Sequence, residues 1–387
     1  MSKRGVRSRW TQDRKYVAPQ IYCQESRVKT KRRLKIDAIL HRHHTFLLHW
    51  LGPTLFIKLK QTKANIPIFI HQKNNYLANL KNLNLKPTIK ERPHTFIIII
   101  IIMTSKSKKQ QLIHYTDYPG AEPAILFVHG YTCDETDWVN QVNHFGLVGQ
   151  RVITLDLPGH GNSMDCYTTN ETMQAMGSDV VTLLHDHLHV TSVIVVGHSM
   201  GTIIATEIAI QAPDIVVGIA LIDGSCFAEG DPDLAVAKCN ATFEHFGFTT
   251  SVESIFASMF LPDSDEKEKM HIIDRALAHP ERISIEISCS AIRWCAADFE
   301  HQYSQLKVPV QVVQSTDRGE GNERVFVTAD THIEWHHKLK TYGVYVEFDL
   351  VEDCGHFVML EKPEVVNANI ERLLERIDTA AAVEAAQ

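Results

Sequence analysis

Residues 193–209 read V-I-V-V-G-H-S-M-G-T-I-I-A-T-E-I-A. The first four residues form an apolar run that is typical of a buried strand, and the residues from 201 to 212 have the spacing of a helix. Between them, Gly197, Ser199 and Gly201 form the pattern G-x-S-x-G. Such a turn between a strand and a helix is strained and leaves no room for side chains at the flanking glycines. It points the serine hydroxyl outward at the helix N-terminus, so we predict that Ser199 is a nucleophile.

Short apolar runs alternate with longer helical patterns on both sides of this stretch. The apolar runs lie at 124–128, 152–155, 193–196, 216–222, 310–313 and 344–348. The clearest helical patterns lie at 173–188, 201–212 and 363–377. Buried strands that alternate with amphipathic helices indicate an α/β fold, in which a mostly parallel sheet is flanked by helices.

The alternation is interrupted between residues 224 and about 307. This interval has helical patterning and contains no convincing strand. It also carries aromatic residues, namely Phe243, Phe246, Phe248, Phe256, Phe260 and Trp294. We predict a helical cap here, over the carboxyl ends of the strands, where open α/β sheets bind their ligands.

Three further motifs accompany the serine pattern. His129-Gly130-Tyr131 follows the first core strand, D-L-P-G-H-G-N-S occupies residues 156–163, and G-H-F at residues 355–357 precedes L-E-K-P-E at 360–364. In this order the motifs resemble those of the α/β-hydrolase superfamily, and the resemblance extends from Ile113 to Ile377. It implies the α/β-hydrolase fold with a cap and requires neither a metal nor an organic cofactor.

The resemblance also implies roles for individual residues. His356 would be the general base that takes the proton of Ser199 and returns it to the leaving group. The backbone N–H groups of Met200 and Tyr131 would form the oxyanion hole, with Gly130 in the same loop. His198, beside the nucleophile, is expected to face away from the reacting centre and to pack in the core.

The acid of the implied Ser-His-Asp triad has two candidates, Asp223 and Asp317. Each follows an apolar strand and could reach His356. The commoner family position is after the later strand, as G-x-x-D, but here Ser315 replaces the glycine and Asp317 comes one residue early. Asp223 matches the position after the preceding strand that some family members use. The pattern slightly favours Asp223, and both candidates stay open.

A serine nucleophile excludes the family branches that use aspartate, namely haloalkane dehalogenases and epoxide hydrolases. A cap rich in phenylalanine favours a small to medium apolar acyl group. We therefore expect hydrolysis of a carboxylic ester, or of a related acyl or lactone substrate, through an acyl-enzyme. The alternatives are a carbon–carbon bond hydrolase and a non-turnover small-molecule receptor or pseudoenzyme on the same fold.

Residues 1–102 differ from the rest of the chain in charge and complexity. They hold 21 Lys and Arg against four Asp and Glu, whereas residues 103–387 hold 18 against 42. They show no sustained periodicity beyond two apolar patches at 45–51 and 54–57, and they end in six isoleucines before Met103. A transit peptide, a nucleic-acid-binding tail and a spurious upstream extension are the three interpretations. The isoleucine run and the abrupt change in composition favour the last, a disordered or spurious extension before a hydrolase domain at 103–387.

The eight cysteines form no C-x-x-C pair and no spacing that is typical of zinc sites. This usage is typical of a cytoplasmic protein whose thiols stay reduced. No apolar run reaches the length of a membrane-spanning helix. For residues 103–387 we expect a small-molecule acyl substrate and no nucleic-acid partner, and the oligomeric state stays open.

Overall fold

The computed structural model describes residues 112–386, except for positions 170, 227, 320–323 and 343–344, together with three short strands earlier in the chain. Contacts divide the chain into two compact units, Met1–Ile99 and Ile100–Gln387. In the first unit, β1 (Leu47–Leu51), β2 (Thr54–Lys58) and β3 (Phe69–His71) form an antiparallel sheet. The isoleucine run lies outside the described residues, so the assignment of residues 1–102 as an extension stays a prediction.

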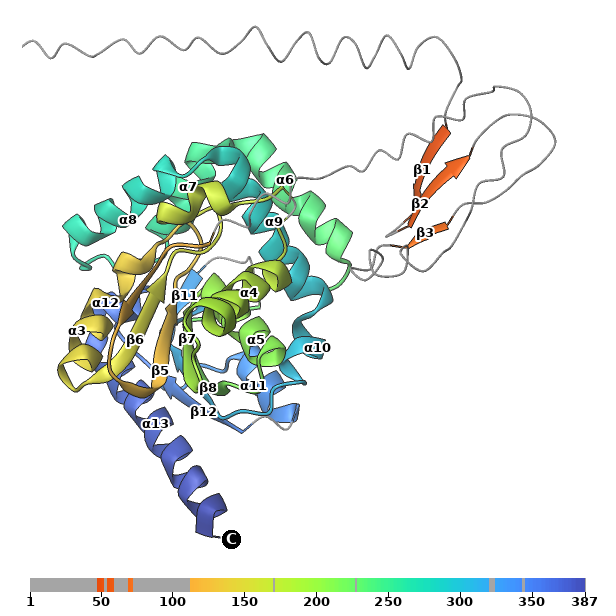
Figure 1. The fold of residues 1–387 in the computed structure, drawn as a ribbon. Coiled ribbons are helices and arrows are strands. Elements are labelled where there is room, and N and C mark those ends of the chain that lie inside the picture. The colour runs from red at the N-terminus through yellow and green to blue at the C-terminus, as the bar shows by residue number, and fades with distance from the viewer. Residues whose placement is uncertain are drawn as a thin grey trace, which may run out of the picture. The chain divides into compact units, whose positions relative to one another are not determined.

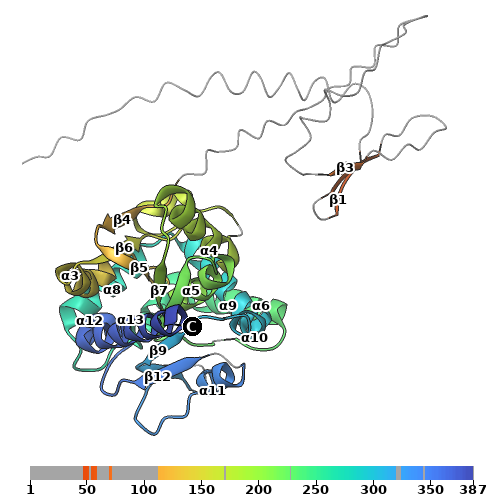
Figure 2. The same ribbon diagram turned by 60° about the horizontal axis from the view of Figure 1, so that its bottom comes forward.

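A seven-stranded sheet forms the core of the second unit (Figures 1 and 2). The strands lie in the order β12-β9-β8-β7-β5-β6-β4, and every neighbouring pair is parallel except β4 with β6. Their bounds are β4 (Tyr115–Tyr118), β5 (Ala121–Val128), β6 (Gln150–Leu155), β7 (Val193–His198), β8 (Val216–Ile222), β9 (Val310–Gln314) and β12 (Val346–Leu350). This mostly parallel sheet confirms the predicted α/β fold.

All six predicted strands are present; five lie within β5 to β9, and the sixth, predicted at 344–348, overlaps β12, which spans Val346–Leu350. The sequence analysis missed β4, the antiparallel edge strand. It is only four residues long, and its sequence Y-T-D-Y contains an acidic residue and no buried position. A short, partly exposed edge strand lacks the continuous apolar run by which the central parallel strands are recognised.

Helices cover both faces of the sheet, and alternate side chains of each strand meet different helices. On β5, Leu126 and Val128 belong to the core on the side of α4 and α5, whereas Ile125 and Phe127 belong to the core on the side of α3 and α13. This period of two is the geometry of a strand that is buried on both faces. The helices are α3 (Val139–Leu147), α4 (Met173–Thr182), α5 (Met200–Gln211), α11 (Glu334–Thr341), α12 (Val358–Glu361) and α13 (Pro363–Ala386).

The described residues between β8 and β9 form five helices and no strand, as expected for the cap interval. The helices are α6 (Pro232–Phe246), α7 (Phe248–Ala257), α8 (Glu266–Ala278), α9 (Glu281–Ala297) and α10 (Phe299–Tyr303). Figure 1 shows α6, α7 and α8 gathered beyond one end of the sheet. Met259, just after α7, accepts a hydrogen bond from the backbone N–H of His356 at 2.8 Å, so this end carries the predicted site.

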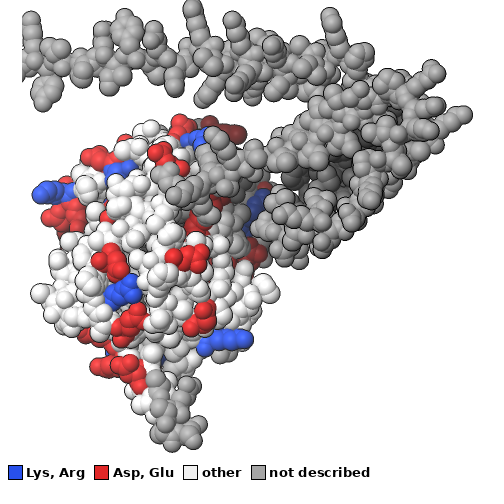
Figure 3. All heavy atoms as spheres, in the orientation of Figure 1, with Lys and Arg blue, Asp and Glu red and all other residues white. Residues whose placement is uncertain are grey.

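The surface of the second unit is acidic. On the face shown in Figure 3, Asp and Glu side chains are spread over the described residues and Lys and Arg side chains are fewer. This agrees with the 42 acidic and 18 basic residues of the segment 103–387. Among the described helices, none is long and apolar enough to cross a membrane.

Candidate active site

The predicted nucleophile lies in a strained turn between β7 and α5. Ser199 has φ 53° and ψ −118°, and its backbone N–H donates to the carbonyl of Ile222 at 2.9 Å. A Cβ atom at Gly197 would lie 2.1 Å from the carbonyl oxygen of Gly201, and one at Gly201 would lie 2.4 Å from that of Val128. Both flanking positions therefore require glycine. Because Ser199 directly precedes α5, its hydroxyl lies in the positive potential of the helix N-terminus.

His356 lies in the loop between β12 and α12, and its side chain is almost fully buried, with the residue 1% exposed. With the proton on Nδ1, the imidazole donates to Oδ2 of Asp223 over 2.5 Å. This leaves Nε2 unprotonated, as a base that accepts a proton from a serine must be. His356 and Ser199 line the same small cavity.

Asp223 follows β8 directly, and its carboxylate accepts five hydrogen bonds, the longest of them from Arg324 at 3.5 Å. Its Oδ1 atom accepts the backbone N–H groups of Ser315 and Thr316, each at 2.7 Å. Its Oδ2 atom accepts the hydroxyl of Thr316 at 2.5 Å and Nδ1–H of His356 at 2.5 Å. Burial raises the pKa of this carboxyl, while Arg324 and the bonds from Thr316 and Ser315 oppose the rise. The carboxylate is thus fixed in one orientation, toward His356.

Asp317 occupies a different environment. It is half-buried on β10 (Thr316–Arg318), which pairs with β11 (Arg324–Phe326) in a small antiparallel sheet. In that sheet Asp317 lies opposite Val325. Of the two candidate acids, the structure therefore brings Asp223 into hydrogen-bond contact with His356.

The predicted oxyanion loop passes close to the nucleophile. A Cβ atom at Gly130 would lie 3.1 Å from Cβ of Ser199, so only glycine lets the loop approach this far without strain. Tyr131 follows in the loop, and Met200 is the first residue of α5. The N–H groups of the first helical turn have no intrahelical acceptor, so that of Met200 is free to bind a developing oxyanion.

The side chain of Tyr131 points toward the cap. Its hydroxyl donates to the carbonyl of Ser284 on α9 at 3.2 Å, and its ring stacks on Phe256 of α7 with the centroids 6.3 Å apart. Burial raises the pKa of the phenol, so Tyr131 stays neutral. These contacts connect the oxyanion loop to two cap helices.

The cavity beside Ser199 is small. Its volume is about 10 Å³, far below the few hundred Å³ of a typical ligand pocket. None of its lining residues carries an Arg, Lys, Asp or Glu side chain. They are Gly130, Tyr131, Cys133, His198, Ser199, Phe256, Met259, His356 and Phe357.

Comparison with known sequences agrees with this geometry. The profile of the alpha/beta hydrolase family matches residues 125–369, which make up more than half of the chain and contain Ser199, Asp223 and His356. The chain belongs to the alpha/beta hydrolase family. Its members share the fold, while their reactions differ.

Similar proteins include hydrolases with different substrates. The chain is 25% identical to an (E)-2-((N-methylformamido)methylene)succinate hydrolase of Acinetobacter baylyi, over 71% of this chain and 99% of that protein. A thermophilic esterase from Thermogutta terrifontis has a similar fold, with a TM-score of 0.55, 20% identity, and 68% and 93% of the two chains covered. The enol-lactonase from Burkholderia xenovorans also has a TM-score of 0.55, with 22% identity, and 68% and 96% of the two chains covered.

The hydrolase has a buried arginine beside its His-Asp pair that the sequence analysis missed. Nη1 of Arg324 lies 2.9 Å from Nδ1 of His356 and 3.5 Å from Oδ2 of Asp223, and it also donates to the hydroxyl of Thr316. Burial lowers the pKa of Arg324 to about 9. Burial first, and then the charges of Arg324 and Arg318, lower the pKa of His356 well below its usual range. No sequence pattern singles out Arg324, because its place depends on the pairing of β10 with β11.

His198 does more in this hydrolase than the predicted packing. Its ring contacts those of His356 and Phe357, with centroids 4.6 Å and 5.1 Å away. With its proton on Nε2, it also donates to the backbone carbonyl of His356 at 3.0 Å. The expectation of packing alone was incomplete, because β7 ends beside the histidine loop and the side chain of His198 reaches it. His198 supports the loop that carries the predicted base.

Proposed function

We propose that the protein is a serine hydrolase that cleaves a small carboxylic ester or lactone, with Ser199, His356 and Asp223 as its triad. The observation that carries this proposal is the 2.5 Å contact between Nδ1 of His356 and Oδ2 of Asp223, beside a serine in a glycine-flanked turn. A histidine oriented by a carboxylate next to a serine at a helix N-terminus is the arrangement that activates a hydroxyl nucleophile.

In the first half of the proposed reaction, Oγ of Ser199 attacks the carbonyl carbon of the ester while Nε2 of His356 takes the hydroxyl proton. The backbone N–H groups of Tyr131 and Met200 donate to the oxyanion of the tetrahedral intermediate. The imidazolium then protonates the leaving alkoxide, the C–O bond breaks, and an acyl-Ser199 ester remains. Asp223 keeps the imidazole in the required tautomer and stabilises its protonated form.

In the second half, water replaces the released alcohol. His356 takes a proton from the water as the oxygen attacks the acyl carbon, and the resulting intermediate collapses when the proton returns to Oγ of Ser199. A carboxylic acid leaves and the free enzyme is restored. For a lactone, the alcohol and the acid are parts of one product molecule.

The cavity supports an uncharged, small acyl group. With a volume of about 10 Å³, the cavity admits an acyl group only if the cap moves, and Phe256 and Met259 give it an apolar wall from the cap side. A dicarboxylate such as a succinate would need a cation to balance its charge, and no Lys or Arg lines this cavity. The esterase and enol-lactonase of similar fold are consistent with this choice of substrate class.

The test is turnover of p-nitrophenyl esters from acetate to dodecanoate by the full chain, with Ser199→Ala alongside. We expect the highest kcat/KM for the shortest acyl groups and loss of activity in Ser199→Ala to the background rate. Ser178→Ala, an exposed serine on α4, serves as the matched control and should keep the wild-type rate. Ester turnover that survives Ser199→Ala would contradict the proposed nucleophile.

If the protein is folded by circular dichroism but hydrolyses none of these esters, ester hydrolysis is excluded and two further assays choose between the alternatives. Turnover of a 1,3-diketone would then replace ester hydrolysis with carbon–carbon bond hydrolysis at the same serine. Saturable binding of such ligands without turnover would instead replace the enzyme proposal with the receptor alternative.

A further inference from the structure

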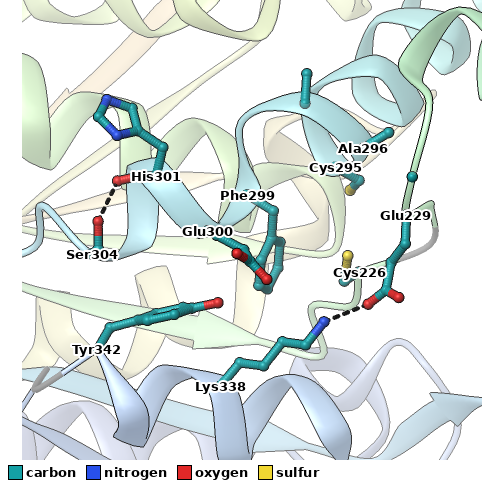
Figure 4. A pocket seen from close by; sticks show the side chains of 12 residues that line it. Cys226, Glu229, Cys295, Ala296, Phe299, Glu300, His301, Ser304, Lys338 and Tyr342 are labelled. Atoms are coloured by element: carbon teal, nitrogen blue, oxygen red, sulfur yellow. Dashed lines mark hydrogen bonds and ion pairs between the residues drawn. The ribbon is translucent and has the colours of Figure 1, made fainter.

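A second and larger cavity lies away from the catalytic residues, between the cap and α11 (Figure 4). It has a volume of about 730 Å³ and shares no lining residue with the cavity at Ser199. Its walls come from the loop after β8, the end of α9, α10 and α11. The lining includes two thiols and charged and aromatic side chains, among them Cys226, Cys295, Glu229, Glu300, Lys338 and Tyr342.

The two thiols of this cavity face each other. Cys226 lies in the loop after β8, three residues beyond Asp223, and Cys295 lies in the last turn of α9. Both side chains line the same cavity, and the thiol of Cys226 donates to the carbonyl oxygen of Ala228 at 3.4 Å. In Figure 4 both sulfur atoms point into the same space between the loop and the helix.

The surroundings of Cys226 favour its thiolate. The neighbouring thiol of Cys295 is the main cause that lowers the pKa of Cys226, burial and the carboxylate of Glu229 oppose the lowering, and the ammonium group of Lys338 adds to it. Lys338 is itself paired with Glu229 at 2.5 Å, which limits its effect. Cys226 is half-buried and lines an open cavity, so a small oxidant in solvent can reach it. A reachable thiol of lowered pKa next to a second thiol is the arrangement found in redox-sensitive cysteine pairs.

Other cysteines of the same unit lack this combination. Cys133 and Cys354 are buried, and burial raises the pKa of each. Cys239 on α6 is buried and Cys289 on α9 is half-buried; the pKa of Cys239 is lowered to about 7, chiefly by Cys289, but neither residue lines the large cavity. A place on the wall of the large cavity distinguishes the pair of Cys226 and Cys295.

We propose that Cys226 and Cys295 form a peroxide-sensitive site, in which Cys226 is oxidised first and Cys295 resolves it to a disulfide. The thiolate of Cys226 attacks one oxygen of hydrogen peroxide, the O–O bond breaks, and a sulfenic acid and hydroxide form. The thiol of Cys295 then attacks the sulfenic sulfur, the S–S bond forms and water leaves. Sulfur is oxidised by two electrons overall and the peroxide is reduced to water. A dithiol reductant reverses the reaction.

The disulfide would tie the loop after β8 to helix α9 of the cap. Residues 226 and 295 are far apart in sequence, so the bond closes a long loop and restricts the unfolded chain. We expect the oxidised protein to melt roughly 5 °C higher than the reduced one. The effect is independent of the proposed hydrolysis, because neither cysteine lines the cavity at Ser199.

The test is peptide mapping of the full chain after brief treatment with a few equivalents of hydrogen peroxide. Free thiols are blocked with N-ethylmaleimide and the digest is analysed without reduction. We expect one cross-linked species that joins the peptides of Cys226 and Cys295 and is lost after dithiothreitol, while Cys133 and Cys354 stay reduced. The same mapping on a Cys239→Ser/Cys289→Ser protein excludes exchange with the second pair and should give the same link.

The order of the two steps is tested with dimedone, which traps sulfenic acids. In Cys295→Ser the dimedone adduct should accumulate on Cys226, and in Cys226→Ser no adduct should form on Cys295. The proposal is overturned if peroxide leaves Cys226 and Cys295 as reduced as Cys133, or if their link forms only after denaturation in urea. Mapping of the wild-type chain decides this even if a variant fails to fold.

Discussion

Replacement of Asp223 by asparagine should remove nearly all activity while leaving the fold intact. Oδ2 of Asp223 accepts Nδ1–H of His356 over 2.5 Å, and this bond selects the tautomer whose Nε2 can take the serine proton. An amide NH₂ at that position would donate to Nδ1 instead and leave the proton on Nε2. The histidine could then no longer act as a base. In the wrong tautomer, kcat falls by roughly 10³- to 10⁴-fold, or about 4–5.5 kcal/mol of transition-state stabilisation.

The carbonyl oxygen of the asparagine would still accept the backbone N–H groups of Ser315 and Thr316, which Asp223 binds through Oδ1. The amide NH₂ that replaces Oδ2 no longer accepts from Thr316 or from the buried Arg324, so we expect the free energy of unfolding to fall by about 3 kcal/mol. Steady-state ester hydrolysis and urea unfolding of the same preparation measure the two effects separately. Asp317→Asn is the matched control, since Asp317 is half-buried on β10, and its activity should stay within about threefold of wild type. A 10³-fold loss in Asp317→Asn, with Asp223→Asn active, would refute the assignment.

Three further variants test other parts of the site. Gly201→Ala puts a Cβ atom 2.4 Å from the carbonyl oxygen of Val128, so its free energy of unfolding in urea should fall by about 2 kcal/mol or more. The control is Gly146→Ala in an exposed part of helix α3, where the new Cβ atom has no neighbour within 4 Å and stability should not fall. Arg324→Met removes a cation 2.9 Å from Nδ1 of His356 and should raise the pKa of that histidine. Because the base must be neutral, the acid limb of the pH profile of kcat/KM then moves to higher pH. Arg324→Lys, which keeps a cation, should move this limb less. An unmoved limb in Arg324→Met contradicts this reasoning. Tyr131→Phe loses only the hydrogen bond to Ser284 and keeps the backbone N–H of residue 131. Its kcat should therefore stay within about threefold of wild type, while its free energy of unfolding falls by about 1 kcal/mol. A 100-fold loss of kcat would instead assign the hydroxyl itself to catalysis.

The central strands and the serine turn could be predicted from sequence because each has a strict local requirement. A strand buried on both faces must be apolar throughout, as Val193–Val196 is. The turn at Ser199 requires glycine at two fixed positions because the backbones of neighbouring segments approach within about 2.1–2.4 Å of where a Cβ atom would lie. Such local requirements restrict the residue types at these positions, so they can be recognised in a single sequence.

The acid could not be decided from sequence because its choice depends on tertiary structure. Asp223 and Asp317 both follow strands that lie side by side in the sheet, so both are near His356 in any plausible fold. A positive φ of 47° at Asp223 and the backbone N–H groups of Ser315 and Thr316 orient one carboxylate toward the histidine. The pairing of β10 with β11 instead places Asp317 opposite Val325 in a small antiparallel sheet. The same pairing puts Arg324 beside the histidine, which no local pattern indicates.

The central claim is that Ser199 is the activated nucleophile, and covalent labelling tests it most directly. Incubation of the full chain with an alkyl fluorophosphonate should add one phosphonyl group per molecule. Peptide mapping should locate that group on Ser199, and Asp223→Asn should react far more slowly. Labelling that is absent from the folded protein, or that persists in Ser199→Ala at the wild-type rate, would contradict the claim.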